Sequence, residues 1–144
     1  TNLQAAIGLA QLSRINNFLK LRTKVFKIYD GYFKKHKDID LLPKNSWSKN
    51  SLWLYTIILK SLNEKKRDKL IKKLSEIGIE TRPGFYPLNT MDPYKKYSRG
   101  LYPITNKISY CSLSLPSTPS LSRSKILYIY KNLILEKEKI ENLK

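Results

Sequence analysis

Apolar side chains recur at intervals of three and four residues through the first third of the chain, which is the period of one face of an α-helix. The face comprises Ile15, Phe18, Leu19, Val25, Phe26, Tyr29 and Phe33. Thr1 or Asn2 can cap its start, and no proline interrupts the pattern. The sequence therefore predicts one long helix over residues 1–36. Small side chains such as Ala6 and Ala10 in its opening turns would let another backbone approach closely, from a second subunit or within an ordinary core.

A strand, a helix and a second short strand follow a polar connection over residues 38–51. Residues 52–59 are almost entirely apolar at odd and even positions alike, which predicts a strand covered on both faces. Asn63 can cap the next helix, and Gly78 stands where a helix end favours a left-handed residue. Residues 79–82 are predicted to form the short strand. The predicted buried stripe of the helix comprises Leu70, Ile71, Leu74 and Ile77.

The stretch from residue 83 to residue 120 is predicted to be irregular, because six prolines break it. Its aromatic side chains argue against disorder, and a loop of this length in a compact domain is usually functional. Within it, we expect one helical turn at 94–97 and a short helix at 104–111, with Pro103 at its first position. A final helix begins near Ser122. These elements together predict an α+β domain, with a small sheet that includes antiparallel strands and is flanked by helices.

The net charge of +17 is carried mainly by lysines, many of which are interspersed with Glu and Asp along the predicted helices. One interpretation is a solvated, lysine-rich surface. A second is a basic surface for nucleic acid or another acidic partner, since a positive face attracts any polyanion in a salt-sensitive way. A third is that the positive field helps to attract a nucleotide-linked substrate. Charge alone does not choose among them.

Length and composition favour a single globular domain. The 144 residues normally bury one core, and 41% of them are hydrophobic. The longest apolar run, residues 52–59, is far shorter than the ~20 residues that span a bilayer. The chain opens without a basic start followed by an apolar leader, and a lone Cys111 suits a reducing compartment. A cytoplasmic location is therefore expected.

Independent catalytic chemistry has few candidate residues. His36 is the only histidine and is expected to be a solvated residue at a helix end. One His and one Cys are too few ligands for a zinc site. The five glycines lie too far apart for a phosphate-binding loop. We therefore predict neither a catalytic constellation nor a metal site within this chain.

The best candidate site is the loop over residues 80–89, which two prolines stiffen. Arg82 offers a planar fork for a carboxylate or a phosphate. Tyr86 offers a hydroxyl on an aromatic ring, and Asn89 offers an amide. A rigid connector, in which Arg82 simply pairs with a surface acid, is the alternative interpretation.

Four segments resemble the DegT/DnrJ/EryC1/StrS aminotransferases, in the order in which that family carries them. They are residues 1–12 (TNLQAAIGLAQL), 51–55 (SLWLY), 78–83 (GIETRP) with 86–88 (YPL), and 112–117 (SLSLPS). The resemblance covers essentially the whole chain, and four segments in register are specific.

The resemblance implies the C-terminal small domain of the type I fold of enzymes that use pyridoxal 5′-phosphate (PLP). Residues 1–36 would be a linking helix and residues 37–144 the small domain. Enzymes of this family act as homodimers with sites at the subunit interface, and they transfer an amino group, usually from glutamate, to a nucleotide-linked keto sugar. The Thr-Arg-Pro and Phe-Tyr-Pro-Leu segments favour the perosamine synthase-like branch. That branch aminates C4 of a GDP-linked 4-keto-6-deoxy sugar for polysaccharide or O-antigen synthesis.

The same resemblance places most of the catalytic machinery in a large domain that residues 1–144 do not include. The family's Schiff-base lysine, the Asp beside the pyridinium nitrogen and most phosphate contacts lie there, so PLP is expected to be bound mainly by that large domain. No cofactor-binding residue is expected within residues 1–144, and the fragment alone is expected to be inactive. Carried over by position, Arg82, Tyr86 and Asn89 would line the sugar-nucleotide side of the site. Family members commonly carry His where Asn89 stands, so proton transfer is not expected there. Neither nucleic acid nor a membrane is an expected partner, and a non-enzymatic basic binding module is the alternative function.

Overall fold

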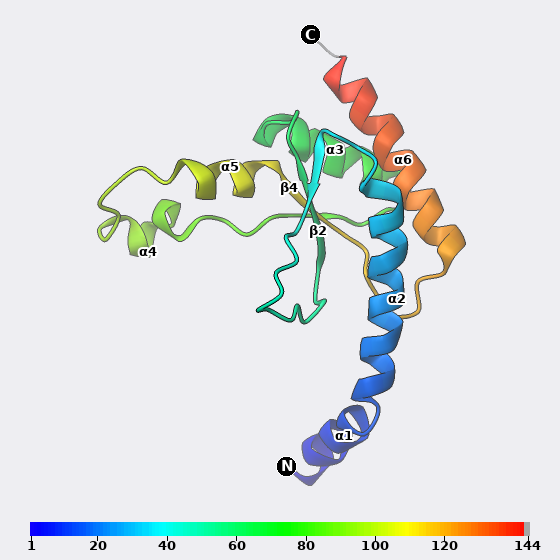
Figure 1. The fold of residues 1–144 in the computed structure, drawn as a ribbon. Coiled ribbons are helices and arrows are strands. Elements are labelled where there is room, and N and C mark those ends of the chain that lie inside the picture. The colour runs from blue at the N-terminus through cyan, green and yellow to red at the C-terminus, as the bar shows by residue number, and fades with distance from the viewer. Residues whose placement is uncertain (143–144) are drawn as a thin grey trace.

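The computed structural model describes residues 1–142, which form a four-stranded antiparallel sheet packed against helices (Figure 1). The strand order is β1-β2-β4-β3, and the core combines the inward side chains of the sheet with those of α2, α3 and α6. This arrangement confirms the predicted α+β class. The elements are α1 (Asn2–Leu12), α2 (Ile15–Phe33), β1 (Ile39–Leu41), β2 (Tyr55–Leu59), α3 (Glu64–Glu76), β3 (Arg82–Pro83), a 3-10 turn (Leu88–Thr90), α4 (Asp92–Lys95), α5 (Pro103–Cys111), β4 (Ser112–Leu115) and α6 (Arg123–Glu141).

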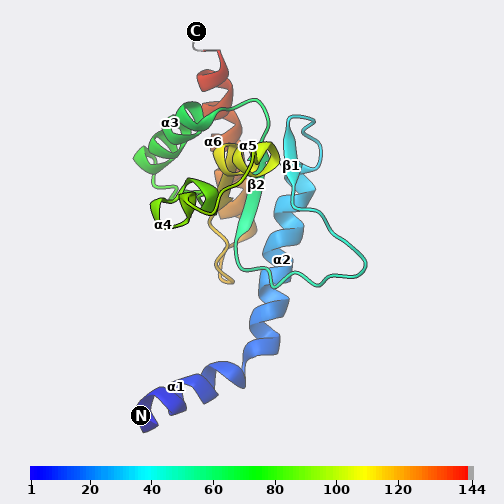
Figure 2. The ribbon, with the colours of Figure 1, turned by 90° about the vertical axis from the view of Figure 1, so that its left-hand side faces the viewer.

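The N-terminal segment forms two helices, so the prediction of one long helix over residues 1–36 is wrong. Ser13 and Arg14 separate α1 from α2, and Arg14 has φ −103° and ψ 1°. The Ser13 hydroxyl donates to the Ala10 carbonyl at 3.0 Å, a local bond of the kind that competes with regular helix. Thr1 caps α1, as predicted. All side chains of α1 are exposed, and the helix points away from the sheet, whereas α2 buries one face in the core (Figures 1 and 2).

β4 lies inside the sheet, although the sequence predicted an irregular segment there. It pairs with β2, where Leu113 lies opposite Ile57, and with β3, where Ser114 lies opposite Arg82. All four residues of β4 are buried. The two leucines of the strand join the core, and its two serines line a hollow on the other side of the sheet. The Ser-Leu alternation is a period-2 pattern, but it covers only four residues. The surrounding prolines indicate irregular structure, and so short a pattern does not outweigh them.

β2 is shorter than predicted, and its two faces differ in burial. It spans Tyr55–Leu59 rather than 52–59. Thr56 and Ile58 are only half-buried, so the predicted cover on both faces is wrong for the part of the chain that the structure describes. The buried face consists of Tyr55, Ile57 and Leu59.

The two outer strands are also short. β1 lies inside the connection over residues 38–51 that the sequence predicted to be polar, and it pairs Ile39 with Leu59. A strand was predicted over 79–82, but β3 spans Arg82–Pro83 and shares only Arg82 with that range. A proline cannot donate a ladder hydrogen bond and is tolerated at the edge of a sheet, which is where β3 lies.

The helix ends agree with the local signals in the sequence. The Asn63 side chain accepts a hydrogen bond from the Lys66 amide at 2.9 Å, which caps α3. Gly78 adopts φ +78°, the left-handed conformation expected after a helix. Pro103 opens α5, and the Ser122 side chain caps α6. Each of these four signals predicted its element correctly.

The buried stripe of α3 differs from the prediction at two positions, Ile71, which is only partly buried, and Ile77. Ile77 is exposed, because α3 ends at Glu76 and the chain turns away there. Arg67 is buried instead, and its guanidinium donates to the Ser109 carbonyl at 2.9 Å and to Asp68 at 2.7 Å. A buried guanidinium needs such partners, which the sequence pattern of apolar positions does not reveal.

His36 is half-buried, so the prediction of a solvated residue at a helix end is wrong. Its Nε2 lies 2.8 Å from the hydroxyl oxygen of Tyr130, and the two rings meet edge to face with centroids 5.7 Å apart. Tyr130 also stacks on Tyr32 at 4.9 Å. His36 therefore links the end of α2 to α6 and has a structural role.

Candidate functional site

A hollow of about 620 Å³ lies on the side of the sheet opposite the core. Its floor is formed by Thr56 and Ile58 of β2 with Ser112 and Ser114 of β4. The hydroxyl oxygens of Thr56 and Ser114 lie 2.9 Å apart. Its walls come from the connections on either side of the sheet and from α5; they include Ser51, Trp53, Leu54, Gly84, Phe85, Tyr86, Pro87, Leu88, Thr105 and Ile108. We call this cavity the sheet hollow.

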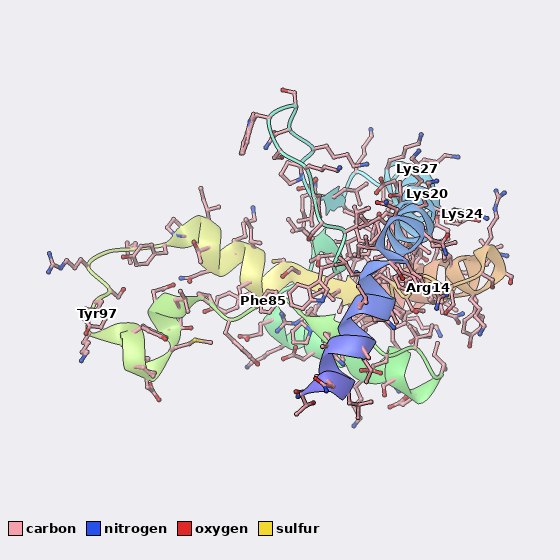
Figure 3. All side chains as sticks on the ribbon, turned by 90° about the horizontal axis from the view of Figure 1, so that it is seen from below. Arg14, Lys20, Lys24, Lys27, Phe85 and Tyr97 are labelled. Atoms are coloured by element: carbon pink, nitrogen blue, oxygen red, sulfur yellow. The ribbon has the colours of Figure 1, made fainter. Side chains whose placement is uncertain are left out.

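Two exposed aromatic rings stand at the mouth of the sheet hollow. Trp53 precedes β2 and Phe85 follows β3, and their ring centroids lie 6.0 Å apart. Figure 3 shows Phe85 close to the sheet, whereas Tyr97 lies at the far end of the arm that contains α4 and α5. Sequence reasoning identified neither Trp53 nor Phe85 as a site residue. Both nevertheless lie in segments that the sequence analysis singled out, Trp53 in residues 51–55 and Phe85 in the loop over residues 80–89.

Two hydrogen bonds hold the loop after β3 in place, one to β4 and one to α5. The Gly84 amide donates to the Ser112 carbonyl at 3.2 Å, and the Ser109 hydroxyl donates to the Phe85 carbonyl at 2.8 Å. The Ser109 carbonyl in turn accepts from Arg67. A Cβ at Gly84 would lie 1.8 Å from the Ser112 Oγ and 3.0 Å from the Ser112 Cβ. Only glycine lets the loop approach the strand this closely.

Replacing Gly84 with alanine should therefore destabilise the protein by about 1–3 kcal/mol, because the new methyl group overlaps the Ser112 side chain. Adding Ser112→Gly should recover much of that loss, since it removes both atoms that the methyl group would meet. The measurement is the urea-unfolding free energy of the two single variants and the double variant in the full-length protein. Gly100→Ala is the matched control, because nothing lies within 4 Å of its Cβ position. Equal stability of Gly84→Ala and Gly100→Ala would contradict the packing argument.

The structure places the three predicted site residues at different points around this loop. Tyr86 is exposed and lines the sheet hollow. Asn89 is half-buried in the 3-10 turn and lines an adjacent hollow of about 420 Å³, which shares Leu88 with the first. Arg82 lines neither cavity; its side chain is 74% exposed, and it pairs with Glu80 at 3.1 Å. Tyr86 and Asn89 thus lie near each other around Leu88, and Arg82 stands apart on the edge strand.

The ion pair of Arg82 does not occupy its guanidinium fully. The Glu80 carboxylate accepts one hydrogen bond from one nitrogen of the Arg82 guanidinium, and the side chains of Glu80 and Arg82 are both largely exposed. An exposed ion pair of this kind contributes little to stability. The remaining N–H groups of Arg82 are therefore free to bind an anion in a bidentate manner.

Two tyrosines of the core form structural hydrogen bonds. Burial raises the pKa of Tyr29, whose hydroxyl donates to the Pro116 carbonyl at 2.9 Å. Burial and the nearby charge of Asp30 raise the pKa of Tyr55, whose hydroxyl donates to Asp30 at 2.9 Å. Both tyrosines therefore stay neutral near pH 7 and do not act as bases. Within residues 1–142, no three His, Cys, Asp or Glu side chains are grouped so that they could hold a metal ion.

The described residues do not fit the attachment of PLP. Lys137 is the one buried lysine between residues 1 and 142, and its ammonium group pairs with Asp38 and with Glu141, the latter at 2.8 and 2.9 Å. Burial alone would lower the pKa of Lys137, but the hydrogen bonds to these two carboxylates raise it overall. The same bond from Lys137 holds the pKa of Asp38 below its ordinary value. A lysine that forms a Schiff base must lose its proton, so Lys137 is a structural residue.

Comparison with known proteins gives a consistent assignment. The DegT/DnrJ/EryC1/StrS aminotransferase family model matches residues 1–134. GDP-perosamine synthase of Escherichia coli O157:H7 is 33% identical over 134 residues, which cover 92% of this chain and 35% of that protein. GDP-perosamine synthase of Vibrio cholerae is 33% identical over 127 residues, covering 88% and 34% respectively. The chain thus spans about a third of the length of these curated relatives.

Solved structures agree with the sequence comparison. The putative sugar aminotransferase Spr1654 from Streptococcus pneumoniae in its PMP form superposes with a TM-score of 0.87 and is 26% identical over 97% of this chain and 36% of that one. The same protein has also been solved in a PLP form. Helicobacter pylori PseC, an aminotransferase of pseudaminic acid biosynthesis, shares the fold with a TM-score of 0.80 at 21% identity over 94% of this chain and 37% of that one. Since the family model spans residues 1–134, the chain belongs to the DegT/DnrJ/EryC1/StrS aminotransferase family.

Proposed function

We propose that residues 1–144 are the C-terminal part of a PLP-dependent aminotransferase that transfers an amino group from glutamate to a nucleotide-linked 4-keto-6-deoxy sugar. The observation that carries this proposal is the 33% identity to GDP-perosamine synthases from three bacteria. The matching region includes the loop with Arg82, Tyr86 and Asn89, and the substrate is therefore expected to be a GDP-linked sugar. The product would serve polysaccharide or O-antigen assembly.

In this proposal, the chain binds and orients the sugar nucleotide. Arg82 pairs with a phosphate oxygen, for which a planar guanidinium is well suited. Tyr86 and Asn89 hydrogen-bond to the sugar, and Asn89 has no titratable group with which to move a proton. Trp53 and Phe85 exclude water from the mouth of the sheet hollow. PLP supplies the electron sink for amino transfer and is held by the rest of the enzyme, because the residues described here do not fit its attachment.

The exposed surface of α1 supports the proposed domain organisation. Leu3, Leu9 and Leu12 of α1 are largely exposed, and an apolar surface of this kind marks a missing contact. We propose that residues 1–36 link residues 37–144 to a large PLP-binding domain, and that the complete enzyme is a cytoplasmic homodimer. The isolated chain would then be inactive.

The test is an assay of the full-length protein with PLP, glutamate and GDP-4-keto-6-deoxymannose, with the product identified by mass spectrometry. The expected product is the 4-amino sugar nucleotide, and its formation should require glutamate. Residues 1–144 alone should give no product. A product that has lost a hydroxyl group would assign the protein instead to the chemistry named for one relative, the Yersinia pseudotuberculosis GDP-4-keto-6-deoxy-D-mannose 3-dehydratase, which is 35% identical over 81 residues. No turnover of any keto-sugar nucleotide would favour the alternative, a basic binding module.

A further inference from the structure

Among residues 1–142, six cationic side chains and no acidic one line an open groove of about 1220 Å³ along α2. Three of them follow α2 at spacings of four and three residues, which return to the same side of a helix. Figure 3 shows Lys20, Lys24 and Lys27 pointing to the same side of α2. The six residues, which we call the basic face, are Lys20, Lys24, Lys27, Lys35, Lys49 and Arg123.

The basic face is not neutralised by the protein itself. All six side chains belong to exposed residues, and within residues 1–142 none of them forms an ion pair with a carboxylate. Other surface lysines do have such partners: Lys73 pairs with Glu76, Lys95 with Asp92 and Lys139 with Glu136. Lys65, Lys69 and Lys72 of α3 likewise form no ion pair, but that helix also carries acidic side chains, whereas no acidic side chain of residues 1–142 lines the groove of the basic face.

A loop with an exposed tryptophan stands beside the basic face. Residues 42–51, between β1 and β2, are all exposed, and Trp47 within them is 83% exposed. Arg22 of α2 donates to the carbonyls of Leu52 and Trp53 at 2.7 and 2.8 Å, which fixes the end of this loop against α2. In Figure 2 the loop extends to the right of α2, whereas α1 runs to the left. The exposed apolar helix α1 therefore projects to a different side of the molecule from this loop.

We propose that the basic face and the Trp47 loop form a docking surface for an anionic lipid bilayer. Lysines near a membrane surface attract anionic headgroups, and Trp residues favour the headgroup region. Five of the six cations are lysines, which act as compact point charges, whereas nucleic-acid recognition favours Arg and several stacking aromatic rings. Tyr32, the one aromatic residue in the groove, is already stacked on Tyr130. No helix within residues 1–142 could cross a bilayer, and surface docking requires none.

The test is sedimentation of the full-length protein with vesicles of 30% phosphatidylglycerol and 70% phosphatidylethanolamine, compared with vesicles of pure phosphatidylcholine. Binding should be confined to the anionic vesicles and should weaken as salt rises. The triple variant Lys20→Gln/Lys24→Gln/Lys27→Gln should lose about a hundredfold in affinity. Trp47→Ala should give a smaller loss. A blue shift of tryptophan emission on binding should be present in the wild type and reduced in Trp47→Phe.

The matched control is Lys65→Gln/Lys69→Gln/Lys72→Gln, which removes the same charge from exposed positions on α3 and should bind vesicles like the wild type. Circular dichroism should show that both triple variants remain folded, since all six lysines are exposed. Equal losses in the two triple variants would overturn the proposal, because net charge alone would then explain binding. The proposal would also be overturned if a twenty-nucleotide single-stranded DNA bound the basic face while the vesicles did not. None of these outcomes depends on amino transfer, which is assayed separately.

Discussion

Replacing Leu113 with alanine should lower the free energy of unfolding by about 2–5 kcal/mol. Leu113 is 0% exposed and lies in β4, between Ile57 of β2 and Pro83 of β3. Truncation would leave a cavity in the core, next to strands that are themselves short and cannot easily collapse onto it. Urea unfolding of the full-length protein, followed by far-UV circular dichroism, would measure the effect.

The matched control is Leu101→Ala. Leu101 is 97% exposed, so this substitution removes the same atoms from the surface and not from the core. Its unfolding free energy should stay within about 0.5 kcal/mol of the wild type. If Leu113→Ala were no more destabilising than Leu101→Ala, then β4 would not be an inner strand of the sheet. Amide hydrogen exchange in β2 should also be faster in Leu113→Ala, because β2 pairs directly with β4.

Replacing Arg82 with alanine should reduce the apparent affinity for the sugar nucleotide roughly ten- to a hundredfold, provided that the proposed function is correct. A charge-assisted hydrogen bond from a guanidinium to a phosphate contributes about 1.5–3 kcal/mol, and Glu80 leaves most of the Arg82 donors free. Asn89→Ala should have a smaller effect, because a neutral hydrogen bond contributes about 1 kcal/mol net. Steady-state kinetics of the full-length enzyme would report both changes.

Arg82→Ala should leave the absorbance of bound PLP unchanged, because the loop is proposed to contact substrate and not cofactor. Arg82→Lys keeps the charge but not the planar fork, so it should recover only part of the affinity. Arg99→Ala is the control for the loss of an exposed positive charge, and it should behave like the wild type. If Arg82→Ala abolished PLP binding and left the affinity for the sugar nucleotide unchanged, the loop would contact the cofactor and not the substrate, and the proposal would be contradicted.

Local interactions explain which structural predictions from the sequence are correct. Asn63, Gly78, Pro103 and Ser122 each act within one or two helical turns, and each marks an observed helix end. The amphipathic pattern of α2 likewise identified the residues that enter the core from Val25 to Phe33, whereas Ile15 and Leu19 of the same pattern are exposed. The family, and with it the fold class, follows from four sequence segments in register, which the family model matches across residues 1–134. The three predicted substrate-binding residues remain a prediction.

Contacts between distant segments decided the rest. β4 is an inner strand because residues 112–115 pair with both β2 and β3. A pattern of four residues does not specify that its partners in β2 lie more than fifty positions away in the sequence. The burial of Arg67 depends on the Ser109 carbonyl, and the pairing of Lys137 depends on Asp38. The sheet hollow and the basic face likewise gather residues from several elements. A hydrophobic pattern records whether a side chain avoids water, whereas the identity of its neighbours is fixed only when the whole core packs.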